Sequence, residues 1–504
     1  MGDLTKQMGD FIVDAMKVFD GVLLLVLMLL ILWVIVTYII DVTQTQQTIR
    51  RNYPVIGRFR YFFEHVGEFF RQYFFAMDRE ELPFNRAQRS WVYRAAKNVD
   101  STVAFGSTDN QSGTGRVLFV NCAFPTLGQD AVPPVAVTVG EGCEKPYTTK
   151  SFFNISGMSY GALSKPAVLA LSAGAKEAGC WMNTGEGGLS PYHLEGGADI
   201  VFQIGTAKNG VRDLDGNLSD EKLSDVASHD QVKMFEIKMS QGAKPGKGGI
   251  LPGEKVSEEI AAIRGIKVGE DALSPNRHVD INSFDDLLTM IHRVRTVTGK
   301  PTGFKMVVGK PSHVDDLLKA VKQRGADFAP DFITIDGAEG GTGAAPMALI
   351  DSVGMSLRES LPLLVDKLNQ YCFRKRIKVV ASGKLITPAA VAWALCAGAD
   401  FIVSARGFMF SLGCIQALQC NKNTCPTGIT THDPKFQHGL HPATKAVRVT
   451  SYVNNMIKEV GTIAHSCGVK NPRALDRTHA RIVVGNGLTK GMDEIFPVQQ
   501  EMTD

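Results

Sequence analysis

The sequence predicts an α/β fold: a (β/α)8 TIM barrel with an N-terminal transmembrane helix and a C-terminal helical extension. Beyond about residue 105, short β-branched runs alternate with helical patterns, an order typical of a parallel sheet with crossover helices. Most of these runs end in Gly, Ser or Lys, which suits the ligand-binding end of a barrel. An open doubly wound sheet is the second choice, because no G-x-G-x-x-G motif opens a helix after an early strand.

The first element is an apolar segment without charged residues, residues 21–40. As a helix at about 1.5 Å per residue it would span roughly the 30 Å hydrocarbon core of a bilayer. A cleavable signal peptide is the alternative, but no A-x-A-like site follows the segment. Two lysines precede it and four arginines follow it within twenty residues, so the positive-inside rule places the catalytic domain in the cytoplasm, on a single-pass inner (plasma) membrane anchor.

The predicted domains are therefore an N-terminal tail (1–18), the transmembrane helix (19–42), an aromatic and basic juxtamembrane linker (43–105) and the barrel (106–490) with a cysteine loop (414–425). Within the linker, aromatic residues and arginines crowd together between Tyr53 and Phe75. An amphipathic helix in the membrane interface and a helix packed on the barrel both explain this stretch.

Six runs rich in β-branched and aromatic residues are predicted as strands: 152–155, 234–239, 304–308, 332–336, 378–381 and 401–404. Helical patterns follow several of them, for example over 165–178 and 388–397. No low-complexity linker or internal repeat interrupts this region, which is therefore interpreted as one domain.

The composition narrows the class of protein. The chain has 504 residues, 44% of them hydrophobic and 21% charged, which excludes disorder as the default. The formal net charge of only +3 gives no reason to expect a nucleic-acid partner. Nine cysteines are too few for a disulfide scaffold of this length, and three lie close together, which points to a reducing compartment and a metal centre.

The three clustered cysteines are Cys414, Cys420 and Cys425, the last followed by proline, in a C-x5-C-x4-C-P pattern. Three thiolates so spaced suit an iron–sulfur cluster, and with three local ligands a three-iron cluster is the natural inference. A zinc site usually has a shorter spacing and a fourth ligand. Buried structural cysteines are the other alternative.

Six further motifs lie along the chain in order: NTGEGG from Asn183, EIKMSQGAKPGKGG from Glu236, LPG from Leu251, SPNRHVDI from Ser274, DGAEGGTGA from Asp336 and ASG from Ala381. With the cysteine triplet, they resemble in order and spacing the FMN-containing synthase domain of glutamate synthase, over roughly residues 150–480. The resemblance implies FMN and a 3Fe–4S cluster as cofactors, with the three cysteines as iron ligands.

The residues agree with a flavin site. Glycine-rich loops after several strands leave backbone N–H groups free to bind a phosphate, although each glycine pair alone also fits an ordinary turn. A lysine beside the ring would stabilise the anionic reduced flavin. The resemblance implies these flavin-binding residues: Met158, Ser159, Tyr160, Gln203, Gln241, Lys305, Gly341, Thr342, Gly343, Ser382, Gly383, Arg406 and Gly407.

For the substrate, the resemblance implies Glu186 and Lys244 as catalytic residues and Arg264 and Ser240 as binding residues. An arginine grips a carboxylate, while a lysine and a carboxylate move protons as a carbon–nitrogen double bond takes up hydride. Surface ion pairs for the two cations and a helix cap for Glu186 are the alternatives. Lys247 and Lys255 are expected to be solvated.

The expected activity is the reduction of a 2-imino acid, 2-iminoglutarate or similar, to an amino acid. Ammonia or an amine would supply the nitrogen, and an external donor, a ferredoxin or a reductase subunit, the electrons. No amidotransferase domain is recognised, so we expect no glutamine hydrolysis, and a homo-oligomer is compatible with the sequence. Lys247 and Ile250 replace an acid and an amide of the family's loop, which leaves the substrate open. Alternatives are an N-methylglutamate synthase-like enzyme, another FMN barrel oxidoreductase, or a membrane-tethered electron-transfer module.

Overall fold

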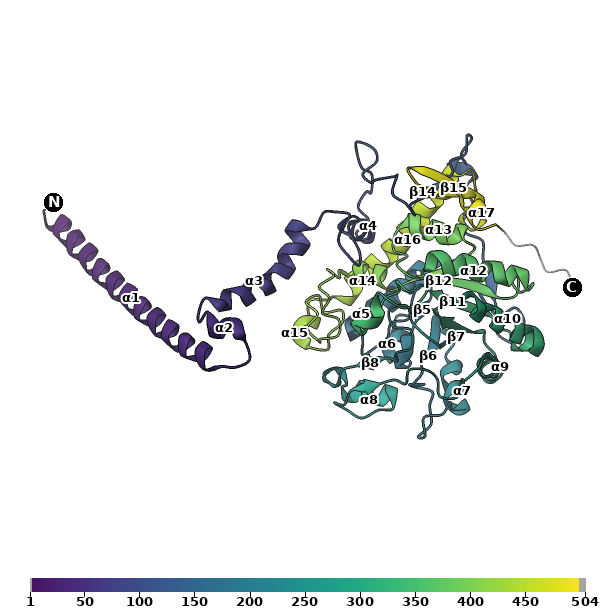
Figure 1. Ribbon diagram of the computed structural model, residues 1–504, viewed down its shortest axis with the longest axis horizontal. Helices are drawn as coiled ribbons and strands as arrows, with labels where there is room; N and C mark the ends of the chain where they lie inside the picture. Colours follow the sequence, from purple (N-terminus) through teal and green to yellow (C-terminus); the bar gives the residue numbers. More distant parts are fainter. Residues whose placement is uncertain (1, 498–504) are drawn as a thin grey trace. The chain divides into compact units, whose positions relative to one another are not determined.

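The computed structural model describes residues 2–497 and separates into two compact units, Met1–Arg86 and Ala87–Asp504 (Figure 1). The first unit contains α1 (Gly2–Thr43), α2 (Thr48–Asn52), α3 (Gly57–Phe70) and a π-helical turn (Arg71–Phe75). The predicted tail and the predicted transmembrane segment thus form one continuous helix.

Within the described residues, α1 alone is long and apolar enough to cross a membrane, as judged by length and composition. Except for the half-buried Val34, its large apolar side chains from Val22 to Ile40 keep about half of their surface exposed. A helix with apolar side chains on all its faces is stable only inside a protein core or a membrane.

The second unit contains a closed barrel of parallel strands in the order β4-β5-β6-β7-β10-β11-β12-β13, which confirms the predicted fold class. The barrel strands are β4 (Phe153–Ile155), β5 (Met182–Asn183), β6 (Ile200–Ile204), β7 (Val232–Lys238), β10 (Thr302–Met306), β11 (Phe332–Asp336), β12 (Lys378–Ser382) and β13 (Phe401–Ser404). The six predicted strands all lie in the barrel. β5 and β6 were not predicted.

Crossover helices connect these strands and surround the barrel. They are α5 (Lys165–Ala178), α6 (Pro191–Glu195), α7 (Asp220–Ser228), α9 (Phe284–Thr298), α10 (Pro311–Arg324), α12 (Leu357–Gln370) and α13 (Pro388–Cys396). Ser164 begins α5 because its side chain accepts a hydrogen bond from the N–H of Ala167, and Gly179 ends the helix in a left-handed conformation. The two helices predicted at 165–178 and 388–397 are therefore confirmed.

A hairpin of β2 (Val137–Val139) and β3 (Tyr147–Thr149) closes one end of the barrel. Val139 and Tyr147 belong to one buried apolar cluster with residues at the start of barrel strands, including Phe332 and Phe401. The N-terminal end of the barrel is therefore filled by side chains, and ligands are left with the opposite, C-terminal end.

Further elements enlarge the barrel. The connection between β7 and β10 carries β8 (Ile250–Leu251), α8 (Glu258–Arg264) and β9 (Ala272–Leu273). After β11 comes α11 (Met347–Ile350), and after β13 come α14 (Arg406–Leu412), α15 (Pro434–Gln437) and α16 (Pro442–Ser466). A separate sheet of β1 (Val117–Phe119), β14 (Ala480–Gly485) and β15 (Leu488–Gly491) is followed by α17 (Met492–Ile495).

Part of the predicted linker 43–105 belongs to the folded body. Helix α4 (Arg86–Ala96) contacts α16. The indole Nε1 of Trp91 donates to Glu459 at 2.9 Å, and the side-chain amide of Asn455 donates to the carbonyl of Ala95 at 2.9 Å. The boundary between the two compact units falls at Arg86.

Candidate functional site

A cavity of about 200 Å³ opens at the C-terminal end of the barrel. Most of the predicted site residues line it: Met158, Ser159, Glu186, Gln203, Gln241, Lys244, Arg264, Lys305, Gly341, Thr342, Gly343, Arg406 and Cys420. A smaller neighbouring cavity of about 40 Å³ shares several of them and adds Ser382 and Gly383. Residues at or just beyond the C-terminal ends of all the barrel strands thus meet in one place.

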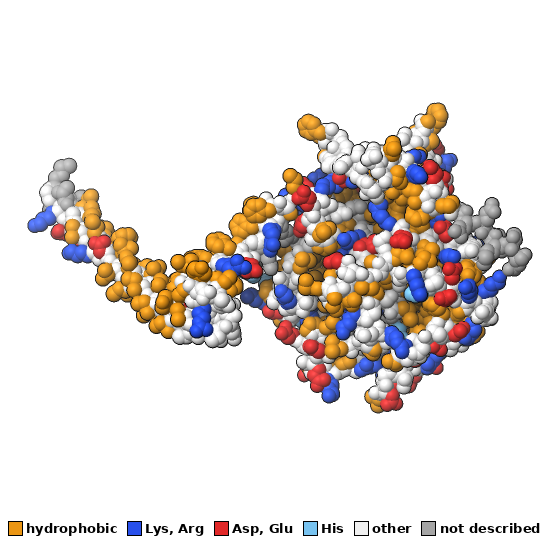
Figure 2. All heavy atoms as spheres, in the orientation of Figure 1, with side chains coloured by type: hydrophobic (Ala, Val, Ile, Leu, Met, Phe, Trp, Pro, Cys, Tyr) orange, Lys and Arg blue, Asp and Glu red, His pale blue; other side chains and the backbone are white. Residues whose placement is uncertain are grey.

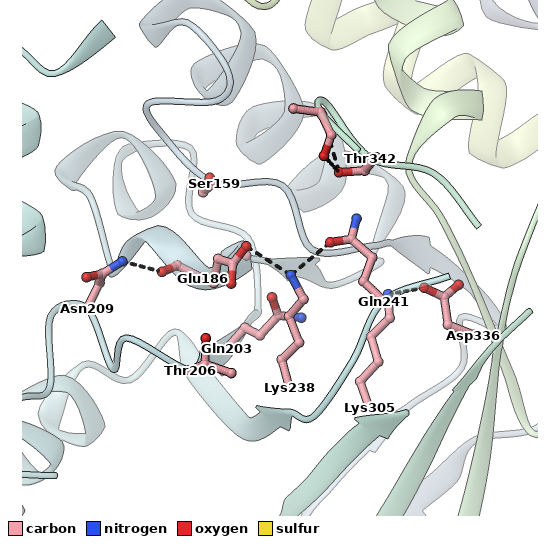
Figure 3. Close-up of polar contacts among 12 residues, drawn as sticks. Ser159, Glu186, Gln203, Thr206, Asn209, Lys238, Gln241, Lys305, Asp336 and Thr342 are labelled. Carbon is pink, nitrogen blue, oxygen red and sulfur yellow. Dashed lines mark hydrogen bonds and ion pairs between the residues drawn. The ribbon is translucent and has the colours of Figure 1, made fainter. Parts of the chain in front are cut away.

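Glu186 forms an ion pair that the sequence did not reveal. Its Oε1 lies 2.9 Å from Nζ of Lys238, at the end of β7, and the same ammonium donates to Gln241 at 2.9 Å (Figure 3). Burial raises the pKa of Glu186, but Lys238, Lys244 and Arg264 more than offset it, so the pKa is lowered overall. Glu186 is therefore ionised at neutral pH.

Lys244 is the least satisfied cation of the cavity. Its side chain is only 3% exposed, yet among residues 2–497 its Nζ has no hydrogen-bond or ion-pair partner. Burial, with the nearby charges of Lys238 and Lys247, lowers the pKa of Lys244 to about 8, although Glu186 opposes the shift. Such a buried, unpaired ammonium that faces a cavity is suited to bind an anion or to donate a proton.

Arg264, the last residue of α8, enters the cavity from the β7–β10 connection. One guanidinium nitrogen donates to the carbonyl of Tyr160 at 3.1 Å and lies 3.3 Å from Oγ of Ser159. Its Nε is buried without a partner in the described structure, and burial lowers its pKa to about 10. The side chain is thus fixed on one side and keeps a donor for a ligand.

Lys305, at the end of β10, reaches Asp336 on the neighbouring strand β11, with Nζ 3.1 Å from Oδ2 (Figure 3). Burial alone would lower the pKa of Lys305, but the carboxylates of Asp336 and Glu236 raise it above its usual value. The lysine is therefore firmly protonated, in the condition required to stabilise negative charge on a neighbouring ring.

Beneath this pair, Glu236 collects three hydrogen bonds inside the barrel. Asn183 donates at 2.8 Å, Gln203 at 2.7 Å and Thr334 at 2.5 Å. The donors come from β5, β6 and β11, so one carboxylate on β7 ties together several strands below the cavity. Gln203 lines the cavity as predicted, but its amide N–H is committed to Glu236.

The loops after β11, β12 and β13 form a cradle around the smaller cavity. A Cβ atom on Gly341 would lie 2.6 Å from Nε of Arg406, and Gly383 has a φ of +139°, which L side chains rarely adopt. Glycine is thus required for the close approach of these loops. Backbone N–H groups beside a partly buried arginine suit a phosphate, so the residues present fit the phosphate end of FMN.

The cysteine loop lies between α14 and α15. Cys420 and Cys425 raise the pKa of Cys414, and Cys425 raises the pKa of Cys420, which indicates that the three thiols lie near one another. Burial raises the pKa of Cys414 to about 12, whereas hydrogen bonds from Thr427 and Thr430 offset burial and lower the pKa of Cys425.

No group of three or more His, Cys, Asp or Glu within residues 2–497 is arranged around a single metal ion. In a cluster each thiolate binds a different iron atom, so the three sulfurs do not converge on one point. The loop is also held firmly: the carbonyl of Cys414 accepts from the Tyr93 hydroxyl at 2.6 Å, and that of Cys420 from Nζ of Lys255 at 2.8 Å. Three closely spaced thiols on a fixed loop beside the cavity fit an iron–sulfur cluster.

Besides Cys414 and Cys425, three predicted residues lie outside both cavities. The hydroxyl of Ser240 accepts from the N–H of Val307 at 2.8 Å, and the hydroxyl of Tyr160 donates to Glu259 at 2.5 Å. A side chain on Gly407 would meet the hydroxyl of Tyr452, so the packing of α16 explains this glycine. These predictions of direct contact remain untested.

The expectation for Lys255 was wrong. Its side chain is 2% exposed, and its Nζ donates to the carbonyls of Cys420 and Thr430. The cysteine loop covers it, an arrangement that no local pattern indicates. Lys247 is exposed as expected.

Sequence reasoning also missed Lys238, Glu236 and Lys384. Lys238 and Glu236 stand in the EIK segment at the end of a predicted strand, and their position alone was a usable signal. Lys384 follows Ser382 and Gly383 directly and lines the phosphate-sized cavity with a left-handed φ of +51°. A lysine next to a strand-end glycine loop was the signal for it.

Known proteins resemble this chain in sequence and in fold. Residues 120–470 match a family described as a conserved region in glutamate synthase. The glutamate synthase large subunit-like protein YerD of Bacillus subtilis is 40% identical over 481 residues, covering 88% of this chain and 91% of that protein. The archaeal-type glutamate synthase (NADPH) of Thermotoga maritima is 34% identical over 335 residues, and this chain spans 62% of its length. A crystal structure of mandelate oxidase with (S)-2-phenylpropionate covers 79% of this chain at 14% identity, with a TM-score of 0.45.

Proposed function

Because this chain belongs to the glutamate synthase family, we propose that it is an FMN- and iron–sulfur-dependent oxidoreductase that reduces a 2-imino acid to an amino acid. Ammonia or an amine supplies the nitrogen, and a separate protein supplies the electrons. The observation that carries the proposal is the single cavity in which the unpartnered Lys244, the ionised Glu186 and Arg264 face the flavin-type loops and Cys420.

FMN held by the strand-end loops would supply hydride to the carbon of the substrate's C=N bond, and a cluster on the three cysteines would relay electrons. Arg264, which lines the cavity, binds the substrate carboxylate through its guanidinium group. Glu186, kept ionised by Lys238, accepts a hydrogen bond from the imine N–H and orients the nitrogen. Lys244 donates the proton that the nitrogen needs as the carbon gains hydride, so the C=N bond becomes CH–NH.

Reoxidation of the reduced flavin tests this function directly. Full-length protein in detergent is reduced anaerobically and mixed with a 2-oxo acid and ammonium, and the flavin absorbance is followed. Rapid return of the oxidised spectrum, dependent on both reagents, supports the proposal. A purely electron-transferring module would show no such dependence, and this result would refute the amino-acid chemistry.

The choice of 2-oxo acid is the open part of the proposal. Ile250 lines the cavity, and its neighbour Gly249 packs so closely on Glu186 that a Cβ would lie 2.6 Å from Oε1. An apolar side chain therefore lines the substrate cavity where the family has an amide. The same flavin reoxidation assay, repeated with 2-oxo acids that carry acidic or apolar side chains, compares the rate with 2-oxoglutarate to the rates with its apolar analogues.

The pKa of Lys244 predicts how the rate depends on pH. Since the protonated ammonium is the acting form and its pKa is about 8, kcat/KM should fall by about tenfold per pH unit above that value. Replacing Lys247 by Gln removes a neighbouring positive charge that lowers this pKa. In the K247Q variant, the fall of kcat/KM at alkaline pH is therefore expected at a higher pH than in the native protein. If the fall occurs at the same pH in both proteins, Lys244 is not the group that causes it.

The cluster is tested by iron content. In the Cys425→Ser variant one of the three thiolates is lost, and we expect the full-length protein, purified anaerobically, to lose most of its iron and its broad visible absorbance. Cys372→Ser is the matched control, because Cys372 is an exposed cysteine outside the triplet. Equal iron in the two variants would remove the proposed ligand set.

We also propose that α1 anchors the enzyme in the inner (plasma) membrane with the barrel on the cytoplasmic side. Support comes from the length and composition of α1 and from the arginines that follow its apolar stretch. A signal sequence passes the same test of length and composition, and a spin label at position 30 in lipid vesicles distinguishes the two.

A further inference from the structure

The segment after α1 forms a second apolar surface. Along α3 and the following π-helical turn, the apolar residues recur with helical spacing: Phe59, Phe62, Phe63, Val66, Phe70, Tyr73 and Phe74. At about 100° per residue these positions fall within roughly one third of the helix circumference. The remaining face carries charged residues such as Arg60, Glu64 and Arg71, together with the aromatic rings of Tyr61 and Phe75.

The apolar stripe lies open in the structure. Phe59, Phe62, Phe63 and Phe74 are between 56% and 73% exposed. Phe59 stacks on Phe63 with ring centroids 6.4 Å apart, and Phe70 contacts Phe74 at 5.3 Å. Figure 2 shows hydrophobic side chains gathered along both α1 and α3. An exposed patch of several aromatic rings on one face indicates a surface that binds a protein or a membrane.

An ion pair between the buried Asp41 and the partly exposed Arg58 holds the start of α3 against the end of α1. Asp41 is 0% exposed. Its carboxylate accepts from Nε and Nη2 of Arg58, each at 2.9 Å, and from the N–H of Val55 at 3.0 Å. A two-pronged arginine–carboxylate pair fixes orientation as well as distance. The base of α3 therefore lies where the apolar stretch of α1 ends.

The position of the Asp41–Arg58 ion pair indicates which surroundings cover the apolar stripe of α3. If residues 21–40 occupy the hydrocarbon core, Asp41 stands at its edge, and α3 starts at the depth of the lipid headgroups. Five arginines against two glutamates between Thr48 and Phe75 give the segment a positive charge. Aromatic rings and arginines are the side chains that favour this region and its anionic lipids.

We infer that α3 lies in the membrane interface on the same side as the barrel, with its aromatic stripe inserted between anionic lipid headgroups and the Asp41–Arg58 pair setting its position. This inference rests on the proposed membrane anchor. The enzyme would thus bind the membrane through two connected elements, the transmembrane helix α1 and the interfacial helix α3. Because α3 lies at the lipid surface, it would restrict how far the barrel moves from that surface.

Spin labelling of the full-length protein in vesicles tests the inference. Single cysteines are introduced by Phe62→Cys on the stripe, Glu64→Cys on the opposite face and Leu30→Cys in α1, each in a chain in which the exposed Cys372 is replaced by Ser. Each labelled protein is reconstituted into phosphatidylcholine vesicles with phosphatidylglycerol. The ratio of collisions with oxygen to collisions with a water-soluble nickel chelate is then measured. Protein without an added cysteine supplies the background.

We expect the ratio at position 62 to be several-fold higher than at position 64, and the ratio at position 30 to be higher still. Equal ratios at 62 and 64 with a high ratio at 30 would overturn the interfacial helix and leave the anchor standing. A low ratio at 30 would refute the anchor itself. Low nickel and low oxygen access at 62, with strong immobilisation of the label, would show that protein, the barrel or a second copy, covers the stripe instead.

The arginines give a second, independent readout. Replacing Arg51, Arg60 and Arg71 together by Gln removes three charges but leaves the aromatic stripe and the Asp41–Arg58 pair unchanged. In the native sequence, we expect phosphatidylglycerol to increase the immersion of position 62 relative to phosphatidylcholine alone. In the triple variant this lipid dependence should largely disappear. An unchanged dependence would refute the role of anionic headgroups.

Discussion

Replacing Lys244 by Met is expected to slow reoxidation of the reduced flavin by a 2-oxo acid and ammonium by about 10²–10⁴-fold, the usual contribution of a positioned proton donor. Lys244 is 3% exposed and faces the cavity without a partner in the part of the chain that the structure describes, so its ammonium has no ion pair there to lose. Methionine keeps the length and apolar contacts of the side chain. The measurement is single-turnover reoxidation at neutral pH, together with the flavin absorbance of the resting protein.

Two results make this test decisive. The K247M variant serves as the matched control, since Lys247 is the exposed lysine of the same loop, and we expect it to retain nearly the full rate at neutral pH. Bound flavin should be equal in both variants. A K244M protein that binds flavin and reoxidises at the native rate would exclude Lys244 as the proton donor.

Replacing Lys305 by Met is expected to have the largest effect on stability, a loss of about 3–5 kcal/mol in the free energy of unfolding. Lys305 and Asp336 are both buried, and Nζ lies 3.1 Å from Oδ2. The variant leaves Asp336 without its cation, and Glu236 loses the same neighbouring charge. Urea denaturation of the full-length protein in detergent, followed by a backbone signal, measures the loss.

The double variant Lys305→Met, Asp336→Asn separates charge burial from packing. It removes both partners, and the N–H of Gly242, which donates to Asp336 at 2.9 Å, keeps an acceptor. We therefore expect the double variant to be more stable than K305M alone. If the two are equally unstable, the ion pair is not the cause of the loss.

The barrel was accessible to prediction because its signals are local. β-branched runs that end in Gly, Ser or Lys, and helices that begin at Ser164 and end at Gly179, express short-range steric and hydrogen-bonding preferences. β5 is only two residues long in the structure, so it lacks the alternation on which strand prediction depends. Its place in the barrel comes from pairing with β4 and β6.

The sequence predicted which residues line the candidate site, but it did not predict which of them form ion pairs with one another. Strand-end residues had to gather at one end of a parallel barrel, and most of the expected ones line the cavity. Which cation meets which carboxylate depends on strand register. Lys238 pairs opposite Lys305 across β7 and β10, which directs one lysine to Glu186 and the other to Asp336.

The sequence by itself determined the barrel class, the long apolar N-terminal segment and the set of side chains at the strand ends, because periodicity and turn chemistry act over a few residues. Tertiary structure alone decided that Lys255 is buried under the cysteine loop, that Lys244 has no partner among residues 2–497, and that Asp41 clamps Arg58. Burial and charge pairing depend on which distant segments cover a residue, and this is set by how the chain closes on itself.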